Sequence, residues 1–489
     1  MATETQAPES ESPPPRETFI AFADRFYPGP LLVAIFLVIL AALLTSTSLD
    51  PFDQLGVVAT GFYELLVVQA AFLFWWVLSP SLVQSGRIGG MLDWIVDRYE
   101  SAVGLTPTTV IGGTAALALT LGWINWALGI IGGIFIGQKL ARRAAEEDVA
   151  VHYPLVLMAG LLGLLLANQG LTSSGGLLMS DQLLGTGEIA AETYPGSSGA
   201  VGDQITTVEN YEGFLWLLGL SEPTSFYGFL LHPSNLLASL VLLVTLPILL
   251  TRLGPSEGVT TIEDAGDLIV TDTIRERLAG YTAPDPEDRT FAERAENNRW
   301  LSILTGLIGL GALGWYLGTG HEPSLMWLLF GLIAGGMLVH TVPQAYIEQC
   351  TNAAGWAVPI GIPFVFYAAV IIMLERAGTF GAIGGLLEGA GVPAVSGYGL
   401  GFLVGLAVPD PGTVWLIVGP MLAAAGADIM ASLVAVMFAS GISNLWLGFL
   451  FLGIFAHRID GFDWLEFFHY ATIITVYVSI VVIGSLLVL

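Results

Sequence analysis

Long apolar runs recur along almost the whole of this chain, and they leave one class of fold open to it. About 20 apolar residues in helical form cross the hydrocarbon core of a bilayer. A membrane β-barrel would show short alternating segments instead. We therefore predict an all-α polytopic membrane protein with roughly 10 to 12 spans. The runs cover residues 30–45, 57–79, 104–138, 153–169, 230–251, 300–317, 325–340, 354–373, 393–408, 430–456 and 466–489.

The charged residues limit the kinds of partner that this protein can bind. They make up only 11% of the 489 residues, with 41 acids against 15 bases. Lys139 is the only lysine. An acidic surface with almost no lysine leads us to expect a salt-loving, archaeal host. Such a surface repels phosphates, which excludes nucleic acid as a partner and leaves the lipid bilayer as the predicted one.

Motifs for catalysis and for cofactors are missing from the sequence. Cys350 is the single cysteine, which excludes a disulfide within the chain and a cysteine metal site. The six histidines show no metal-ligand spacing, and there is no P-loop, GxSxG elbow or HExxH. We therefore predict that the protein is not an enzyme and has no cofactor, apart from Na⁺ as one candidate coupling ion.

Basic residues set the predicted topology, because they gather on the cytoplasmic side of a membrane protein. They lie at 87–98, at 139–143 and within 252–299, whereas 144–251 contains no Lys or Arg. We predict a disordered, acidic, cytoplasmic tail over 1–28, a first membrane half over 29–251, a cytoplasmic acidic loop over 252–299 and a second membrane half over 300–489. The polar stretch 175–225 is placed outside, and the location is the cell (inner) membrane.

One apolar run is too long for a single span. Residues 104–138 would make a helix of roughly 50 Å, against a hydrocarbon core of about 30 Å. Bases lie near both of its ends, at Arg98 and Lys139, so the segment should leave and return to the same side. It therefore holds either two short spans or a re-entrant hairpin, and the polar residue at its middle is Asn125 in "GWINWALG".

A second interruption lies in "GLAVPDPGTVW" (405–415), where Pro409 and Pro411 flank Asp410. Each half also carries a later Gly/Ser/Asn-rich stretch, "ANQGLTSSGG" (167–176) and "FASGISNLW" (438–446). Paired interruptions in two halves indicate a transporter site built from discontinuous helices. We therefore predict an inverted repeat with two breaks in each half, made of discontinuous or re-entrant helices.

Several stretches resemble the short-chain fatty acid transporter family. They include "FADRFYPGPLLVAIFLVILAALLT" (21–44), "INWALGIIGGIFIGQKLARR" (124–143), "YPLVLMAGLLGLLLANQGLTSS" (153–174) and "GADIMASLVAVMFASGISN" (426–444). Family members take up acetoacetate- or butyrate-like monocarboxylates. The resemblance thus implies a secondary-active transporter of small monocarboxylates.

The second half departs from this family. Where members read "NFAVPSGGGHWVIQGP", this chain has Gly405 for the Asn and Asp410-Pro411-Gly412 within the Ser/Gly run. It also has Val414 for the His and Val418 for the Gln, and only Asn444 remains of the family's "W.N..QP.W". The family's "GFSGS" survives as "GLTSS" (170–174) in the first half. The substrate and the coupling ion are the properties that these departures affect.

A substrate carboxylate is predicted to meet amide, hydroxyl and helix-end donors, because no arginine lies deep in a predicted span, with Arg376, which follows the run 354–373, as the one exception left open. Asn125 is the first candidate; the alternative is an amide that joins two helices. The Thr172–Ser174 hydroxyls are the second; the alternative is that they bond back to their own helix. The predicted substrate-binding residues are Asn125, Trp126, Gly129, Thr172, Ser173, Ser174 and Asn444.

Asp410 is the predicted coupling-ion residue, with Asn125 beside it. A charge at membrane depth costs a few kcal/mol and is functional by default, so Asp410 would bind Na⁺ or carry H⁺. The alternative is a break that reaches the interface, where Asp410 is hydrated and merely ends a helix. Glu64 and Asp428 are weaker candidates that we place near the interface.

These expectations combine into uptake of short-chain fatty acids by alternating access, coupled to H⁺ or Na⁺. Other functions remain open: a cation/proton antiporter, a carrier of another small organic anion, or a structural membrane subunit without a polar site. A homodimer is expected only by analogy with other transporters that contain re-entrant hairpins.

Overall fold

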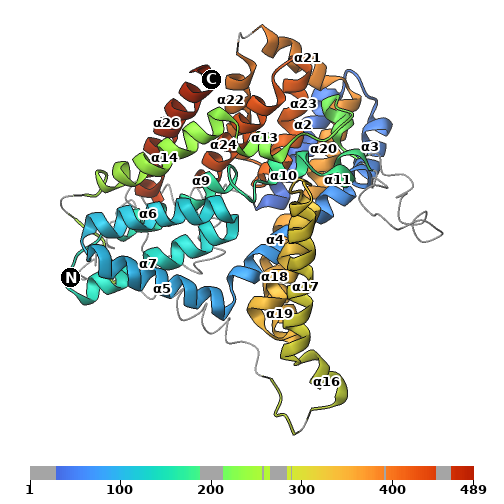
Figure 1. Cartoon of the computed structure of the whole chain (residues 1–489). Coiled ribbons are helices and arrows are strands. Elements are labelled where there is room, and N and C mark those ends of the chain that lie inside the picture. Colours follow the sequence, from blue (N-terminus) through green and yellow to red (C-terminus); the bar gives the residue numbers. More distant parts are fainter. Residues whose placement is uncertain are drawn as a thin grey trace, which may run out of the picture.

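The computed structural model describes residues 29–187, 213–255, 258–264, 283–287, 289–389, 392–447 and 464–488, and every regular element among them is a helix (Figure 1). Seven of these helices are long and apolar enough to cross a membrane, and four shorter apolar helices accompany them. The predicted all-α polytopic class is therefore confirmed. The predicted tail, 1–28, lies outside the described residues.

The elements before residue 252 are α2 (Pro30–Thr45), α3 (Pro51–Glu64), α4 (Leu66–Val83), α5 (Gly86–Val103), α6 (Pro107–Ile124), the π-helix η1 (Leu128–Gly132), α7 (Gly133–Glu146), α8 (Tyr153–Leu161), α9 (Gly163–Ala167), α10 (Ser174–Met179), α11 (Gln182–Thr186), the 3₁₀ helix η3 (Leu215–Leu218), α13 (Phe226–Leu230) and α14 (Pro233–Thr251). The later elements are α16 (Phe291–Glu296), α17 (Arg299–Gly318), α18 (Leu325–His340), α19 (Pro343–Gly361), α20 (Phe364–Arg376), α21 (Thr379–Glu388), α22 (Pro393–Gly405), α23 (Pro411–Ala424), α24 (Ile429–Trp446) and α26 (Trp464–Val488).

Polar caps and prolines fix where many of these helices begin. Thr106 forms a capping box with Thr109 at the start of α6, and Asp428 accepts a hydrogen bond from the Ala431 N–H at the start of α24. Proline occupies the first turn of α6, α14 and α23, where its missing N–H leaves no bond unmade. The apolar runs thus become separate helices because short polar signals punctuate them.

The two parts of the chain interlock along α4. Gln69 Nε2 donates to the Phe364 carbonyl over 2.8 Å near one end of α4, and the Ser81 carbonyl lies 2.7 Å from His340 Nε2 near the other. Helix α4 therefore runs beside α18, α19 and α20 over its whole length. The division into 29–251 and 300–489 stays a prediction, but contacts between its two parts are extensive.

Two helical hairpins open toward opposite ends of α14. In the α6–α7 hairpin, Gly137 lies against Thr114, and Gly112 near its open end faces Thr251 at the end of α14. In the α22–α23 hairpin, Gly397 lies against Leu422. The helix that follows, α24, has Met430 in its first turn beside Gly228 of α13, which immediately precedes α14. Segment 104–138 therefore turns back on itself, as its two flanking bases predicted.

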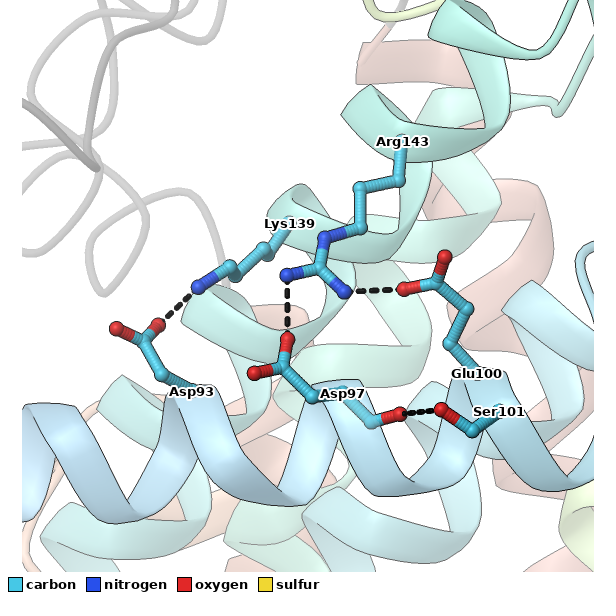
Figure 2. Close-up of polar contacts among 6 residues, drawn as sticks. All are labelled: Asp93, Asp97, Glu100, Ser101, Lys139 and Arg143. Atoms are coloured by element: carbon cyan, nitrogen blue, oxygen red, sulfur yellow. Dashed lines mark hydrogen bonds and ion pairs between the residues drawn. The ribbon is translucent and has the colours of Figure 1, made fainter.

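Helix α5 is amphipathic, is not among the candidate spans, and is fastened to α7 by ion pairs (Figure 2). Lys139 pairs with Asp93, and Arg143 pairs with both Asp97 and Glu100. The acids are spaced three and four residues apart, so they share one face of the helix. These pairs hold the second arm of the α6–α7 hairpin in place.

Part of the polar stretch 175–225 is buried within the protein, while its placement on the outer side of the membrane stays a prediction. All six residues of α10 are buried. Asp181 accepts a hydrogen bond of 2.8 Å from the Met326 N–H, and Ser180 Oγ donates to the Pro323 carbonyl over 2.7 Å. The turn between α17 and α18 therefore closes over the end of α10. Small and apolar residues such as Gly175, Leu177 and Met179 explain why this part packs inside.

Candidate functional site

The first interruption is Asn125, where α6 ends and the chain turns back. Asn125 has an extended backbone, with φ −153° and ψ 131°, and the helix resumes as the π-helix η1. Its side-chain oxygen accepts a hydrogen bond of 3.0 Å from the Leu128 N–H, which caps the new helix. Its amide also exchanges hydrogen bonds of 2.9 and 3.0 Å with the Ser79 hydroxyl on α4. The amide is therefore held at the hairpin tip from two sides.

The second interruption lies between α9 and α10 and touches the first. The Leu171 N–H donates to the Trp123 carbonyl over 2.8 Å, and the Trp126 N–H donates to Thr172 Oγ1 over 3.0 Å. Backbone groups that the two breaks leave unpaired are thus satisfied by each other. The structure brings Asn125, Trp126 and Thr172 together, as predicted for the first half.

The two other hydroxyls of this break, those of Ser173 and Ser174, differ in their hydrogen bonding. Ser173 Oγ accepts from the Gly176 N–H over 3.2 Å and so caps α10, which fits the alternative of a bond to its own helix. Ser174 Oγ is buried and has no hydrogen-bond partner among the described residues. Gly129, the glycine in this group, packs directly against Gly122 and Gly163. The role of Gly129 in the site is to let its own backbone approach those of Gly122 and Gly163 closely.

The third interruption, 406–410, places Asp410 at the start of α23. Asp410 is 0% exposed, so the alternative of a hydrated interfacial residue is wrong. Its Oδ2 accepts bonds of 2.7 Å from the Thr413 N–H and 2.8 Å from the Thr413 hydroxyl, and its Oδ1 lies 3.4 Å from Trp76 Nε1. Two flanking prolines and this cap explain why the helix restarts here.

Helix α4 joins the third interruption to the first two. Trp76 contacts Asp410, and Ser79, three residues later on the same face, contacts Asn125. The Trp126 ring lies 4.9 Å from the Trp76 ring and 5.3 Å from the Trp75 ring. Asn125 and Asp410 therefore meet one face of α4, separated by a cluster of tryptophans. Ser79 was not predicted, since nothing in the run 57–79 marks one serine as part of a site.

The predicted fourth interruption, at 438–446, is wrong. Helix α24 continues without a break from Ile429 to Trp446. Ser443 Oγ donates to the Ser440 carbonyl over 2.9 Å, so this polar stretch is compatible with a continuous helix. Asn444 is nevertheless buried at 2% exposure. Helix α24 packs on both sides of the second interruption, because Gly441 touches Leu165 and Gly175 touches Met437.

Several buried polar atoms on these elements lack a partner within the described part of the chain. Buried polar atoms in proteins are normally hydrogen-bonded. The set therefore offers both donors and acceptors to a small polar ligand. Its members are Trp75 Nε1, Trp126 Nε1, Asn168 Nδ2, Gln169 Nε2 and Oε1, Ser174 Oγ, Ser440 Oγ and Asn444 Oδ1.

The weaker candidates lie outside the site. Glu64 forms an ion pair with Arg376 where α3 and α20 end, and both side chains are partly exposed. Asp428 caps α24. No group of three or more His, Cys, Asp or Glu among the described residues is arranged to hold a metal ion.

The sequence of this chain is similar to those of known membrane transporters. A family model described as "Short chain fatty acid transporter" matches residues 16–214 and 221–489. Proteins of Escherichia coli K12 and Haemophilus influenzae Rd, each named "Putative short-chain fatty acid transporter", are 24% identical over 439 and 441 residues. Each alignment covers 87% of this chain and 88% of the relative. No solved structure gives a significant match.

Proposed function

Because the chain belongs to the short-chain fatty acid transporter family, we propose that it carries small monocarboxylates across the membrane by alternating access, coupled to H⁺ or Na⁺. The observation that carries this proposal is the meeting of the two first-half breaks, where Trp126 N–H bonds Thr172 Oγ1, beside α4 and Asp410. Interrupted backbone at membrane depth persists only where it is buried by protein or lines a cavity.

In this proposal the substrate carboxylate binds near the hairpin tip. Asn125 Nδ2 and the unpartnered Trp126 Nε1 and Ser174 Oγ are hydrogen-bond donors on elements that meet there. A small anion needs only a few such donors in an apolar medium, where each bond is stronger than in water. The buried aromatic rings around Trp126 suit a short alkyl chain. Asn444, on the neighbouring α24, is the predicted second-half contact.

Asp410 is the proposed coupling residue. Its negative charge lies on the same face of α4 as the proposed anion site, one helical turn away. A carboxylate there repels a bound carboxylate unless a cation neutralises one of them. Binding of the cation and of the substrate would therefore favour each other, which is the requirement for symport.

Uptake of labelled C2 to C6 carboxylates into proteoliposomes, with an imposed pH or Na⁺ gradient, tests this function. Asn125→Ala removes one hydrogen bond to a charged ligand, which is worth about 1.5–3 kcal/mol, so KM should rise about 10- to 100-fold. Asp410→Asn should abolish the dependence on the cation gradient. Gln182→Ala, which removes an exposed amide on α11, is the control and should transport normally.

The same vesicles separate the rival functions. Cation flux without carboxylate uptake would instead identify an antiporter. Uptake that responds to neither Asn125→Ala nor Asp410→Asn would place the transport site elsewhere in the molecule.

A further inference from the structure

A small cavity lies between α4, α20 and α23, and its wall includes Thr413, which bonds Asp410. Its volume is about 10 Å³, which is about the room that one water molecule needs. Most of its wall is apolar, including Phe72, Phe364 and Ile371, and Gln69 and Thr413 provide the polar side chains. The cavity therefore has space for a single water held at two polar points.

Gln69 offers the first of these points. Its Nε2 donates to the Phe364 carbonyl over 2.8 Å, which fixes the orientation of the amide. Its Oε1 is buried and has no hydrogen-bond partner among the described residues. A buried acceptor without a donor costs about 1–3 kcal/mol, and a water that donates to it removes that cost.

Thr413 offers the second point, and it leads to Asp410. Its hydroxyl donates to Asp410 Oδ2 over 2.8 Å, so the lone pairs of Thr413 Oγ1 remain to accept a hydrogen bond. A water in the cavity that donates to Thr413 Oγ1 completes a directed chain from water to Thr413 to Asp410. Every hydrogen in this chain already points toward the carboxylate.

We propose that this series of hydrogen bonds, from the cavity water through Thr413, is the proton path to Asp410. The coupling ion of the transporter is therefore H⁺. The inference rests on the proposed function. A solvent hydronium passes a proton to the cavity water, the water passes one to Thr413 Oγ1, and Thr413 passes its own to Asp410 Oδ2. The water oxygen and Thr413 Oγ1 each form one O–H bond and break one, the hydronium loses one and Asp410 Oδ2 gains one, so the net change is one proton moved from solvent to the carboxylate. The reverse sequence releases it.

The surroundings of Asp410 favour a proton over Na⁺. Its three recorded contacts, the Thr413 N–H, the Thr413 hydroxyl and the Trp76 N–H, are all donors to the carboxylate. A metal cation needs oxygen lone pairs around it instead. The cavity also has room for one water, not for an ion with its hydration shell.

Titration of Asp410 would not be masked by neighbouring charges. Helices α4, α10, α22 and α23 carry no charged side chain. The charges on the other described elements that pack near it lie at helix ends. They are Glu375 and Arg376 on α20, Glu388 on α21, Asp428 before α24, and Asp53 and Glu64 on α3.

The test measures butyrate-driven acidification inside proteoliposomes with a trapped pH dye, using the full chain. Thr413→Val removes the hydroxyl but keeps the backbone N–H that caps Asp410. It should slow proton entry about 100-fold, the scale of losing a positioned proton-transfer group. Thr413→Ser should keep most of the rate. Gln69→Leu, which removes the other polar point, should also slow it.

Thr120→Val is the matched control, because the Thr120 hydroxyl is exposed and bonds only the Ala116 carbonyl of its own helix; it should acidify at the wild-type rate. Proton entry by Thr413→Val at the rate of Thr120→Val would overturn the proton path. Butyrate uptake driven by Na⁺ and not by pH would overturn H⁺ as the coupling ion. No butyrate uptake by the wild type under either gradient would count against the proposed function itself.

Discussion

Three glycines determine how closely the two first-half breaks approach each other. A side chain at Gly122 would overlap the carbonyl of Gly163, and one at Gly163 would overlap Gly129. The colliding atoms belong to backbones, which cannot rotate away as a side chain can. Glycine at these positions therefore allows direct backbone contact between α6, η1 and α9, and this contact brings Trp126 within reach of Thr172.

Replacement of Gly122 by alanine should therefore destabilise the protein. Inserting a methyl group into a packed core typically costs about 1–3 kcal/mol, and this site is at the upper end because only backbone surrounds it. Gly311→Ala in α17 is the control, since a side chain there meets nothing within 4 Å; it should raise stability by up to about 1 kcal/mol through helix propensity. Melting temperatures in detergent give both values, and equal melting of the two variants would contradict the argument.

The interruptions that have a local cause in the chain were predictable from the sequence. Pro409 and Pro411 cannot continue a helix, so the break at Asp410 was predictable from the residues alone. The break at Asn125 followed from the length of 104–138 and its flanking bases. The predicted break at 438–446 rested only on the Gly, Ser and Asn content of this stretch. A continuous helix tolerates those residues when hydroxyls such as that of Ser443 bond to the preceding turn.

The α5–α7 ion pairs give one pH dependence at the level of the helix pair. The hydrogen bond from Arg143 lowers the pKa of Asp97 below its ordinary value of 3.8. A lowered pKa in the folded state means that the pair stabilises the fold above about pH 4 and is lost as the pH falls through the lowered pKa.

Asp97→Asn should therefore melt below the wild type at pH 6, and the two curves should converge once the pH has fallen below the lowered pKa of Asp97. Thermal unfolding followed from pH 3 to 7 checks this. Asp285→Asn, an exposed loop substitution, is the control and should show no such convergence. A melting difference for Asp97→Asn that stays constant with pH would show that the pair does not contribute as a charge.

At the scale of the whole molecule, the site depends on packing between parts of the chain that are far apart in sequence. Asp410 is linked to the hairpin tip through α4, and Trp76, which it contacts there, is 334 residues away in the sequence. Periodicity cannot show which face of an almost wholly apolar helix such as α4 meets which partner. For this reason Ser79, Trp76 and Gln69 could not be assigned from the sequence, although the polar residues of the breaks could.

The net charge of −26 also acts on the whole molecule. Like charges repel across the solvent-exposed surface and oppose the compact state, and salt screens this repulsion within about 10 Å at 0.1 M. The melting temperature should therefore rise when KCl is increased from 0.1 to 2 M. Unfolding scans at several KCl concentrations measure it, with uncharged sucrose as the osmotic control. A fall in melting temperature with KCl would show that favourable ion pairs outweigh the repulsion.

The turn between α17 and α18 is tied to the far end of the broken helix by Asp181 and Ser180, and Glu322 in the same turn accepts a hydrogen bond from Ser225 just before α13. Asp181 is buried, so parting these segments would strand a carboxylate in apolar surroundings. If α10 moves, as the proposed alternating access would require, the α17–α18 pair would move with it. The outer side of that pair is almost entirely exposed. The pair would therefore move through the lipid together with the site.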